Sequence, residues 1–344
     1  MTQYIIRNKT LEKCLLNKPV IDLSLYTEIK YISENAFEKC TEVSKIILPK
    51  SVRKINDMTF SNCRSLESVD IPSSAKIEGN PFLNTPLYKK TMRSKGYFII
   101  NHTLINKATD DIDPSEFNML RRINWSAYNS DQKLRELNLS QAVDFEYIEP
   151  YSFYQCSSLS AVVFSSECPL KTIGKQTFAF CGNLYHVDLP ASIEDINKQA
   201  FAKTKWLEKQ MDGNGNLIYN NILISKNAIS QREYVLPDTI KYIGSEALSW
   251  EPFKKVYLNE GLKKIFNNGF AYCSSLEEIY FPDSIKYIGI GAFEGCHNLK
   301  LENISLSFDV ILDNNSFDFL VAAYNDTGLS TLSSVEKGTF LFPP

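Results

Sequence analysis

The chain lacks the residue patterns on which most metal and phosphate sites depend. Its 344 residues include three histidines and no Cys-x-x-Cys pair, so the ligand spacing of a structural zinc site is missing. Its two short Gly-x-Gly segments, at residues 213–215 and 289–291, have no Gly-Lys-Ser/Thr after them, which a phosphate-binding loop needs. We therefore expect no metal site and no cofactor.

The chain also lacks an excess of one charge and any long apolar run. Its net charge of −3 argues against a general nucleic-acid binder, and the absence of an 18-residue apolar run argues against a membrane span. Charged residues interrupt residues 1–20, where the apolar core of a signal peptide would lie. As it stands, the sequence predicts a cytoplasmic protein, or a cell-surface or secreted one if a leader was removed.

What the sequence has instead is a repeat. A cysteine follows a phenylalanine by three residues six times, and this position holds six of the eight cysteines. Within neighbouring pairs the phenylalanines lie 23 or 25 residues apart. These residues, which we call the Phe/Cys ladder, are Phe37/Cys40, Phe60/Cys63, Phe153/Cys156, Phe178/Cys181, Phe270/Cys273 and Phe293/Cys296. A fixed period predicts a solenoid whose stacked coils bury a continuous core, and function through an extended surface rather than a catalytic pocket.

Other positions keep the same phase as the ladder. An isoleucine precedes the phenylalanine by five residues, and a leucine or valine follows it by six. Farther on, Ile279 and Phe281 alternate with Glu278 and Tyr280, and Pro282 follows them. Alternation predicts a short strand, and proline ends it because proline cannot donate a hydrogen bond to the strand ladder.

With these positions in phase, the repeat resembles the BspA-like, or Treponema-type, leucine-rich repeat family. The segment from Ile288-Gly289 through Ala292-Phe293 and Cys296 to Leu299 matches the family pattern Ile-Gly-x-x-Ala-Phe-x-x-Cys-x-x-Leu. The resemblance implies a β-rich, right-handed solenoid of the α/β leucine-rich repeat class, with stacked repeats of ~23 residues, short strands and little regular helix. It also implies non-catalytic recognition of a protein partner, as in adhesins that attach to host proteins at the cell surface.

The resemblance divides the chain into a repeat region and two ends. The predicted parts are an N-terminal cap at residues 1–28, the solenoid at 29–304, and a degenerate last coil with a C-terminal cap at 305–344. Caps are expected because an open solenoid end exposes core side chains and strand edges.

Two coils, at about residues 79–107 and 201–229, are longer than the rest. Residues 82–107 align with residues 201–226 without a gap, at an offset of 119. Each segment carries a polar stretch, at 93–96 or 212–215, before an apolar run, which predicts a hairpin. We interpret both as structural elaborations, and the alternative is a protruding ridge that helps to recognise a partner.

The strand pattern also predicts a binding face. Alternation points the positions eight and ten after the ladder phenylalanine outward, and in leucine-rich repeats such side chains line one concave face. The candidate residues are Lys45, Ile47, Asp70, Val163, His186, Asp188, Lys255, Tyr257, Glu278 and Tyr280. This mixture of apolar, aromatic and charged residues suits a protein partner better than a polyanion, although its aromatic residues also suit a carbohydrate.

The cysteines and tryptophans leave alternatives to this interpretation. We expect the ladder cysteines to be reduced, buried spacers. A cysteine-dependent enzyme is the remote alternative, with Cys181/His186 or Cys296/His297 as the catalytic pair, but burial would raise a ladder thiol's pKa. The three tryptophans are candidate interface anchors, although one is expected to pack inside an enlarged coil; they are Trp125, Trp250 and, inside, Trp206.

Overall fold

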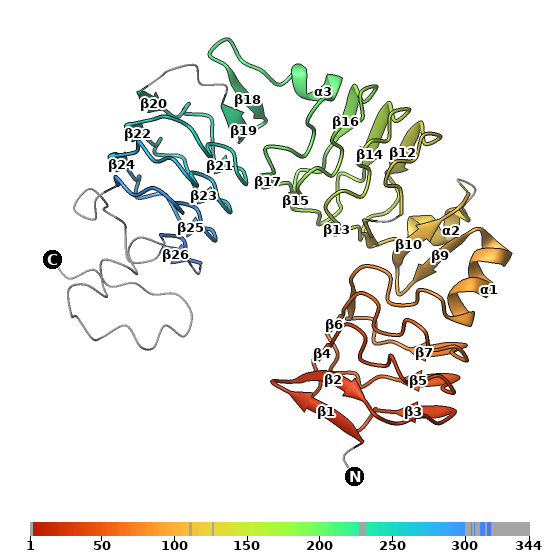
Figure 1. The fold of residues 1–344 in the computed structure, drawn as a ribbon. Helices are drawn as coiled ribbons and strands as arrows, with labels where there is room; N and C mark the ends of the chain where they lie inside the picture. The colour runs from red at the N-terminus through yellow and green to blue at the C-terminus, as the bar shows by residue number, and fades with distance from the viewer. Residues whose placement is uncertain are drawn as a thin grey trace, which may run out of the picture. The chain divides into compact units, whose positions relative to one another are not determined.

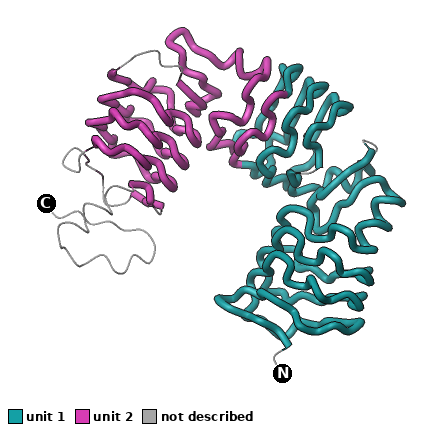
Figure 2. The backbone as a smooth tube through the Cα atoms, viewed as in Figure 1, with its two compact units in different colours: residues 1–170, 181–191 teal, residues 171–180, 192–344 magenta. Residues whose placement is uncertain are grey.

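The chain folds into coils that stack on one another, and most coils contribute two strands (Figure 1). The computed structural model describes residues 3–109, 112–125, 127–226, 232–299, 304, 306, 310–313 and 315–317. The chain divides into two compact units, namely unit 1 (residues 1–170 and 181–191) and unit 2 (residues 171–180 and 192–344) (Figure 2). Most of the predicted C-terminal cap lies outside the described residues.

The coils carry longer strands of three or four residues and short strands of two. The longer strands are β3 (Val20–Asp22), β5 (Lys45–Ile47), β7 (Ser68–Asp70), β12 (Glu136–Leu139), β14 (Ala161–Phe164), β16 (His186–Asp188), β20 (Glu233–Val235), β22 (Lys255–Tyr257) and β24 (Glu278–Tyr280). The short strands are β4 (Tyr31–Ile32), β6 (Lys54–Ile55), β8 (Lys76–Ile77), β11 (Arg122–Ile123), β13 (Tyr147–Ile148), β15 (Thr172–Ile173), β17 (Asp195–Ile196), β21 (Tyr242–Ile243), β23 (Lys264–Ile265), β25 (Tyr287–Ile288) and β26 (Ile311–Leu312).

Strands of each kind pair in parallel from coil to coil. Ile32, Ile55 and Ile77 lie in register on β4, β6 and β8, so the strands recur at the repeat period. Together with the small share of helix, this pairing confirms the predicted β-rich solenoid of repeats of about 23 residues.

The longer strands form three sheets, β3-β5-β7 and β12-β14-β16 in unit 1 and β20-β22-β24 in unit 2. Their second residues, such as Ile46, Val162 and Ile279, are buried, apart from the half-buried Val69 of β7, and the residues on either side point outward. Alternate residues of a strand face opposite sides. We therefore call the first and third positions of these strands the long-strand face.

The short strands place their second residue, an isoleucine in all but β26, toward the core. Their first residue points outward except in β17, where Asp195 is buried, and we call the outward first positions, with the outward residues just before the strands, the short-strand face. In the N-terminal stack of unit 1, β4 and β6 lie across the core from β3, β5 and β7 (Figure 1). The coils of this stack therefore present two different outward surfaces.

Three antiparallel hairpins interrupt the parallel pairing. They are β1–β2 (Tyr4–Arg7 and Thr10–Cys14), β9–β10 (Tyr97–Ile100 and Thr103–Lys107) and β18–β19 (Asn216–Tyr219 and Ile222–Lys226). In all three hairpins the residues pair in the same pattern, with one shift of register in the middle of the hairpin. The second strand of each hairpin pairs in parallel with the next short strand. The sequence comparison aligned the second and third hairpins but missed the first, which no ladder residue marks.

The second hairpin turns later than the sequence predicted. Residues 93–96 end helix α1 (Pro86–Lys95), where Gly96 caps the helix in the left-handed conformation at φ 77°. The hairpin itself turns at Asn101 and His102, whose φ values are 49° and 58°. In the third hairpin, residues 212–215 do form a turn, which joins Met211 to the first strand through an isolated bridge.

In the described part of the chain, helix is confined to short segments beside the hairpins. The helices are α1, α2 (Pro114–Asn118) and α3 (Lys205–Glu208). Thr85 and Thr204 cap α1 and α3, because each hydroxyl accepts a hydrogen bond from a backbone N–H of the first turn. Among the described residues, no helix is long and apolar enough to cross a membrane.

Aromatic rings fill the core of successive coils, and all twelve ladder side chains are buried. The rings of Phe37 and Phe60, and those of Phe270 and Phe293, lie 5.2 Å apart between centroids. Where the ladder lacks phenylalanine, Tyr128 takes its place and stacks on Phe153. Offset aromatic pairs at such distances add to the free energy of burial.

The ladder cysteines also bond to the coil before them. Each thiol lies near a backbone carbonyl oxygen of the preceding coil, at Sγ–O distances of 3.0–3.4 Å. The pairs are Cys40 with Leu16, Cys63 with Phe37, Cys156 with Tyr128, Cys181 with Phe153, Cys273 with Leu248 and Cys296 with Phe270. A cysteine thus combines small apolar volume with a weak donor for a buried carbonyl.

Candidate recognition face

The candidate binding residues predicted from the sequence all lie on the longer strands, at outward positions. They are Lys45 and Ile47 on β5, Asp70 on β7, Val163 on β14, His186 and Asp188 on β16, Lys255 and Tyr257 on β22, and Glu278 and Tyr280 on β24. All of them are exposed or half-buried, so they belong to the long-strand face.

In unit 2 this face carries a pair of stacked tyrosines. Tyr257 and Tyr280 are register partners on β22 and β24, and their rings lie 4.9 Å apart with planes 3° from parallel. Both keep much of their surface in solvent, at 37% and 49% of full exposure. The rings therefore form one rigid, partly exposed apolar surface.

A carboxylate fixes the tyrosine pair at its edge. Glu278 accepts a hydrogen bond of 2.6 Å from the Tyr280 hydroxyl and pairs with the Lys255 ammonium group at 3.0 Å. The bond from Tyr280, and then the pair with Lys255, lower the pKa of Glu278. At neutral pH the carboxylate is therefore charged and holds both neighbours in place.

The strand before this pair was not predicted from the sequence. β20 places Val235 in register with Tyr257, and Glu233 in register with Lys255. Val235 is 69% exposed, so it extends the tyrosine pair into a strip of three side chains, which we call the Val-Tyr-Tyr strip. The signal was present, because Leu236-Pro237 follows Val235 as Phe281-Pro282 follows Tyr280.

A polar hollow flanks the end of this strip. It has a volume of about 720 Å³, and Val235, Tyr234, Asn216 and Lys226 are among its lining residues. Burial raises the pKa of Tyr234, whose hydroxyl donates a hydrogen bond of 3.0 Å to the Asn216 side chain. The hollow thus offers polar groups beside an apolar strip.

The two sheets of unit 1 carry fewer aromatic side chains on this face. On β5 and β7, Lys45 pairs with Asp70 at 3.0 Å beside Ile47. On β16, the Nε2 atom of His186 lies 3.1 Å from the carboxylate of Asp188. These sheets therefore present isolated apolar side chains among charged ones.

The face is more acidic than predicted from the sequence, because the first strand of each sheet was not among the predicted strands. The missed strands β3, β12 and β20 each add an outward carboxylate. The outward acids are Asp22, Asp70, Glu136, Asp188, Glu233 and Glu278, and the outward lysines are Lys45 and Lys255. The long-strand face thus has a negative balance of charge.

Three stretches of the chain match one protein-family model. The BspA type leucine rich repeat region matches residues 3–109, 106–229 and 224–322. The chain belongs to this family. The match confirms the resemblance found in the sequence, and it identifies the long-strand face as part of a leucine-rich repeat. No curated protein matches the chain.

The chain also matches solved structures of other leucine-rich repeat proteins at low identity. A leucine rich cell surface protein of Faecalibacterium prausnitzii is 16% identical, with 91% of this chain and 83% of that chain covered and a TM-score of 0.31. A leucine-rich repeat protein of Bacteroides ovatus is 21% identical, with 89% and 94% covered and a TM-score of 0.25. The leucine rich repeat protein of T. pallidum is 17% identical, with 90% and 96% covered and a TM-score of 0.20.

The leucine-rich repeat coils hold the candidate catalytic cysteines in structural roles. The Cys181 thiol donates to the Phe153 carbonyl group, and hydrogen bonding to Cys156 together with burial raises the pKa of Cys181. His186 faces Asp188 instead, and Cys296 donates to a backbone carbonyl as Cys181 does. No group of three metal-ligating side chains occurs within the described ranges.

A second exposed aromatic pair lies off the strands of unit 2. Trp250 and Tyr272 stack with centroids 4.5 Å apart, and Trp250 is 73% exposed. Each follows the core position of its coil by two residues and has a positive φ, 67° and 60°. Trp125 is also exposed, whereas Trp206 is buried against Phe201, as the alignment with Leu87 predicted.

Proposed function

We propose that this leucine-rich repeat protein is a non-catalytic recognition protein that binds a protein partner through the long-strand face, which the family resemblance implies to be concave. The main observation that supports this proposal is the Val-Tyr-Tyr strip. It combines contiguous apolar surface with ordered charges at its rim, as the centres of protein interfaces do.

The strip is organised before any partner arrives. Tyr280 and Lys255 are already tied to Glu278, and each tyrosine ring is packed against the other. Binding therefore loses little side-chain entropy, and tyrosine offers large contact area with few rotatable bonds. The acids around the strip favour a partner whose contact surface is basic at its rim.

The stacking geometry favours a protein over a sugar at this strip. A sugar ring packs on the open face of an aromatic ring, but Tyr257 and Tyr280 cover one face of each other. Their exposed edges and hydroxyl groups suit the side chains and amides of a protein surface. Carbohydrate binding here remains the alternative that the experiment below can reveal.

The test is a pair of matched double variants in unit 2. Tyr257→Ala/Tyr280→Ala removes the strip, and Trp250→Ala/Tyr272→Ala removes an exposed stacked pair elsewhere. We expect both to keep the melting temperature within a few degrees. Proteins crosslinked to the wild type should also be captured by the tryptophan variant and lost by the tyrosine variant.

Two results would contradict the proposal. In one, the tyrosine variant captures the same protein as the wild type, while changes in the turn at residues 212–215 abolish capture, which would assign recognition to a hairpin coil. In the other, a glycan array binds the wild type and not the tyrosine variant, which would make the strip a carbohydrate site.

A further inference from the structure

The short-strand face of unit 1 has the opposite charge to the long-strand face. Backbone bonds set positive residues of successive coils against one another. The Lys30 amide donates to the Lys9 carbonyl, the Arg53 amide to the Lys30 carbonyl, and the Lys76 amide to the Arg53 carbonyl, at 2.7–2.8 Å. The side chains of Lys9, Arg53 and Lys76 are exposed and that of Lys30 is half-buried. We call these four residues the basic row.

Few acids neutralise this row. Glu78 pairs with Lys54 at 2.8 Å, and no described acidic side chain forms an ion pair with any of the four residues of the basic row. The Arg53 guanidinium group bonds to the Ser74 hydroxyl and to backbone carbonyls, and the Lys30 ammonium group to a carbonyl. Like charges on neighbouring strands destabilise a sheet. Binding of an anionic partner would therefore reduce the electrostatic repulsion within the basic row.

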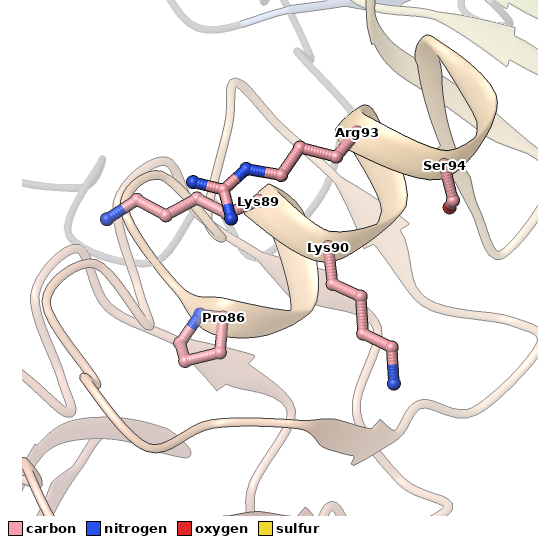
Figure 3. A pocket seen from close by; sticks show the side chains of 5 residues that line it. All are labelled: Pro86, Lys89, Lys90, Arg93 and Ser94. Carbon is pink, nitrogen blue, oxygen red and sulfur yellow. The ribbon is translucent and has the colours of Figure 1, made fainter.

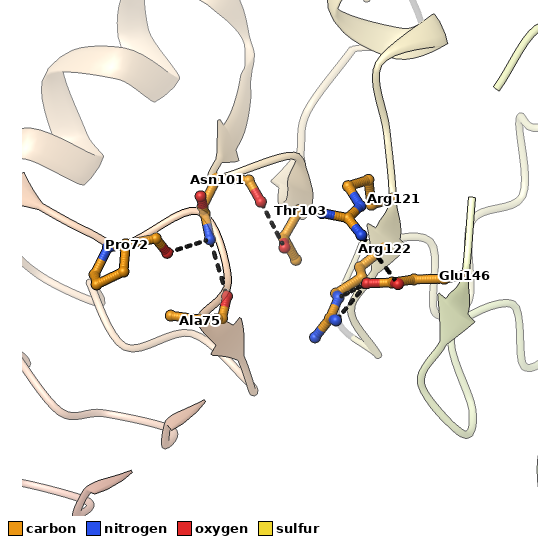
Figure 4. Close-up of polar contacts among 7 residues, drawn as sticks. All are labelled: Pro72, Ala75, Asn101, Thr103, Arg121, Arg122 and Glu146. Carbon is orange, nitrogen blue, oxygen red and sulfur yellow. Dashed lines mark hydrogen bonds and ion pairs between the residues drawn. The ribbon is translucent and has the colours of Figure 1, made fainter. Parts of the chain in front are cut away.

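The basic character continues past the second hairpin. Asn101 donates to the Pro72 and Ala75 carbonyl groups, at 3.3 and 2.9 Å, and so joins the hairpin to the coil before it (Figure 4). Beyond it, Arg121 and Arg122 lie on this face and share Glu146. Positive side chains therefore follow one another along the stacked coils of unit 1.

Aromatic rings lie among these charges. Tyr31, at the start of β4, is 44% exposed, and Tyr147, at the start of β13, is 37% exposed. The Lys76 ammonium group lies 5.3 Å from the centre of the Tyr147 ring. Neither tyrosine forms a stacked pair with another described ring, unlike Tyr257. The exposed part of the Tyr31 ring, and the part of the Tyr147 ring that Lys76 does not cover, are therefore available to a ligand.

We propose that the short-strand face of unit 1 binds an acidic polysaccharide. Cationic groups repeat along the stack at the spacing of neighbouring strands, about 4.8 Å, and a repeating surface fits a polymer that repeats its own charge. The tyrosines add ring surface for sugar packing. Three of the four residues of the basic row are lysines, whose ammonium groups are compact charges with rotatable donors that can contact successive carboxylate or sulfate groups of a flexible chain.

The experiment compares two basic surfaces of unit 1. Lys30→Glu/Lys76→Glu reverses two charges on the short-strand face, and Lys89→Glu/Lys90→Glu makes the same charge change on the exposed side of α1. There Lys89, Lys90 and Arg93 line a separate hollow of about 490 Å³ (Figure 3). Affinity is measured for heparin and hyaluronan, with duplex DNA and polyglutamate as comparison polyanions, over a range of salt concentrations.

We expect the wild type to bind heparin or hyaluronan more tightly than the comparison polyanions. The Lys30/Lys76 variant should lose about tenfold or more in affinity and show a shallower salt dependence, while the α1 variant stays within about twofold. Should the charge-reversed protein fail to fold, Lys30→Gln/Lys76→Gln replaces it, with Lys89→Gln/Lys90→Gln as its control.

Three outcomes would overturn the proposal. An equal loss in both variants would show general electrostatic attraction rather than a site. Equal or tighter binding of DNA or polyglutamate would assign the face to a different polymer. Unchanged or absent binding of both polysaccharides would remove the site altogether. Because the Val-Tyr-Tyr strip is intact in every variant, none of these outcomes bears on the proposed protein recognition.

Discussion

The N-terminal and C-terminal sheets of longer strands share a backbone and differ in what they expose. The third positions of β3, β5 and β7 hold Asp22, Ile47 and Asp70, whereas those of β20, β22 and β24 hold the Val-Tyr-Tyr strip. In both sheets the second positions carry apolar side chains that pack on the core. Buried positions therefore define the coil, and outward positions are free to differ in chemistry.

The largest effect should come from the part that the two sheets share. Phe37→Ala and Phe270→Ala each remove a buried ring that lies 5.2 Å from the next ring of the ladder. We expect each to lower the free energy of unfolding by roughly 3–5 kcal/mol, measured from urea midpoints. A cost at one site and none at the other would show that the two stacks are not packed alike.

A buried carboxylate in unit 2 should give the next largest effect. Asp195 accepts two hydrogen bonds of 2.7 Å from Ser245, yet burial raises its pKa from 3.8 to about 6. The folded state thus binds this proton more tightly than the unfolded chain, so the group's destabilising effect is absent below about pH 4 and complete above about pH 6.

Asp195→Asn should therefore stabilise the protein by about 1–3 kcal/mol at pH 7.5 and by little at pH 4. Asparagine can keep both bonds to Ser245. Thermal unfolding at the two pH values measures the effect, and Asp283→Asn, at an exposed position, serves as the control. A gain that is equal at both pH values would mean that the carboxylate is not the cause.

Changes at the ladder cysteines should be smaller. Cys273→Ala leaves the Leu248 carbonyl group without its donor and should cost about 1–2 kcal/mol, whereas Cys273→Ser keeps a donor and should cost less. The same order is expected at Cys40. If alanine and serine destabilise equally, side-chain volume rather than the thiol bond explains the cysteines.

The smallest effect should follow from exchanging the exposed chemistry. Asp22→Val/Ile47→Tyr/Asp70→Tyr moves the strip onto the N-terminal sheet, and outward changes of this kind usually alter stability by less than about 1 kcal/mol. The lost pair between Lys45 and Asp70 is a surface pair of little weight. A large loss of stability would show that outward positions also help to define the coil.

The sequence predicted the solenoid well because its signal is repeated. Phenylalanine, cysteine and isoleucine recur in one phase, and each occurrence supports the others. The same dependence explains what was missed. β3, β12, β20 and the first hairpin lie in coils without the Phe/Cys pair, so only weaker signals, such as Leu236-Pro237 after β20, mark them.

Helix boundary residues in the enlarged coil were not recognised, because this segment was interpreted only by comparison with the other enlarged coil. Thr85-Pro86 at the start of α1 and Gly96 at its end are ordinary helix boundary residues, but residues 93–96 were interpreted as the turn of a hairpin. The chemistry of the face could be predicted only in part. Spacing placed Tyr257 and Tyr280 on neighbouring strands, but the parallel stacking of their rings and the bridge through Glu278 depend on rotamers that no spacing fixes.

The hairpins have a consequence for how the protein unfolds. In a stack of coils, cooperativity spreads from each coil to its neighbour. Each hairpin begins a new sheet of short strands, so backbone pairing on that side stops and restarts there. Amide hydrogens on opposite sides of a hairpin should therefore exchange as separate cooperative groups. Loss of one group of coils would then leave the next group folded, with its own recognition surface intact.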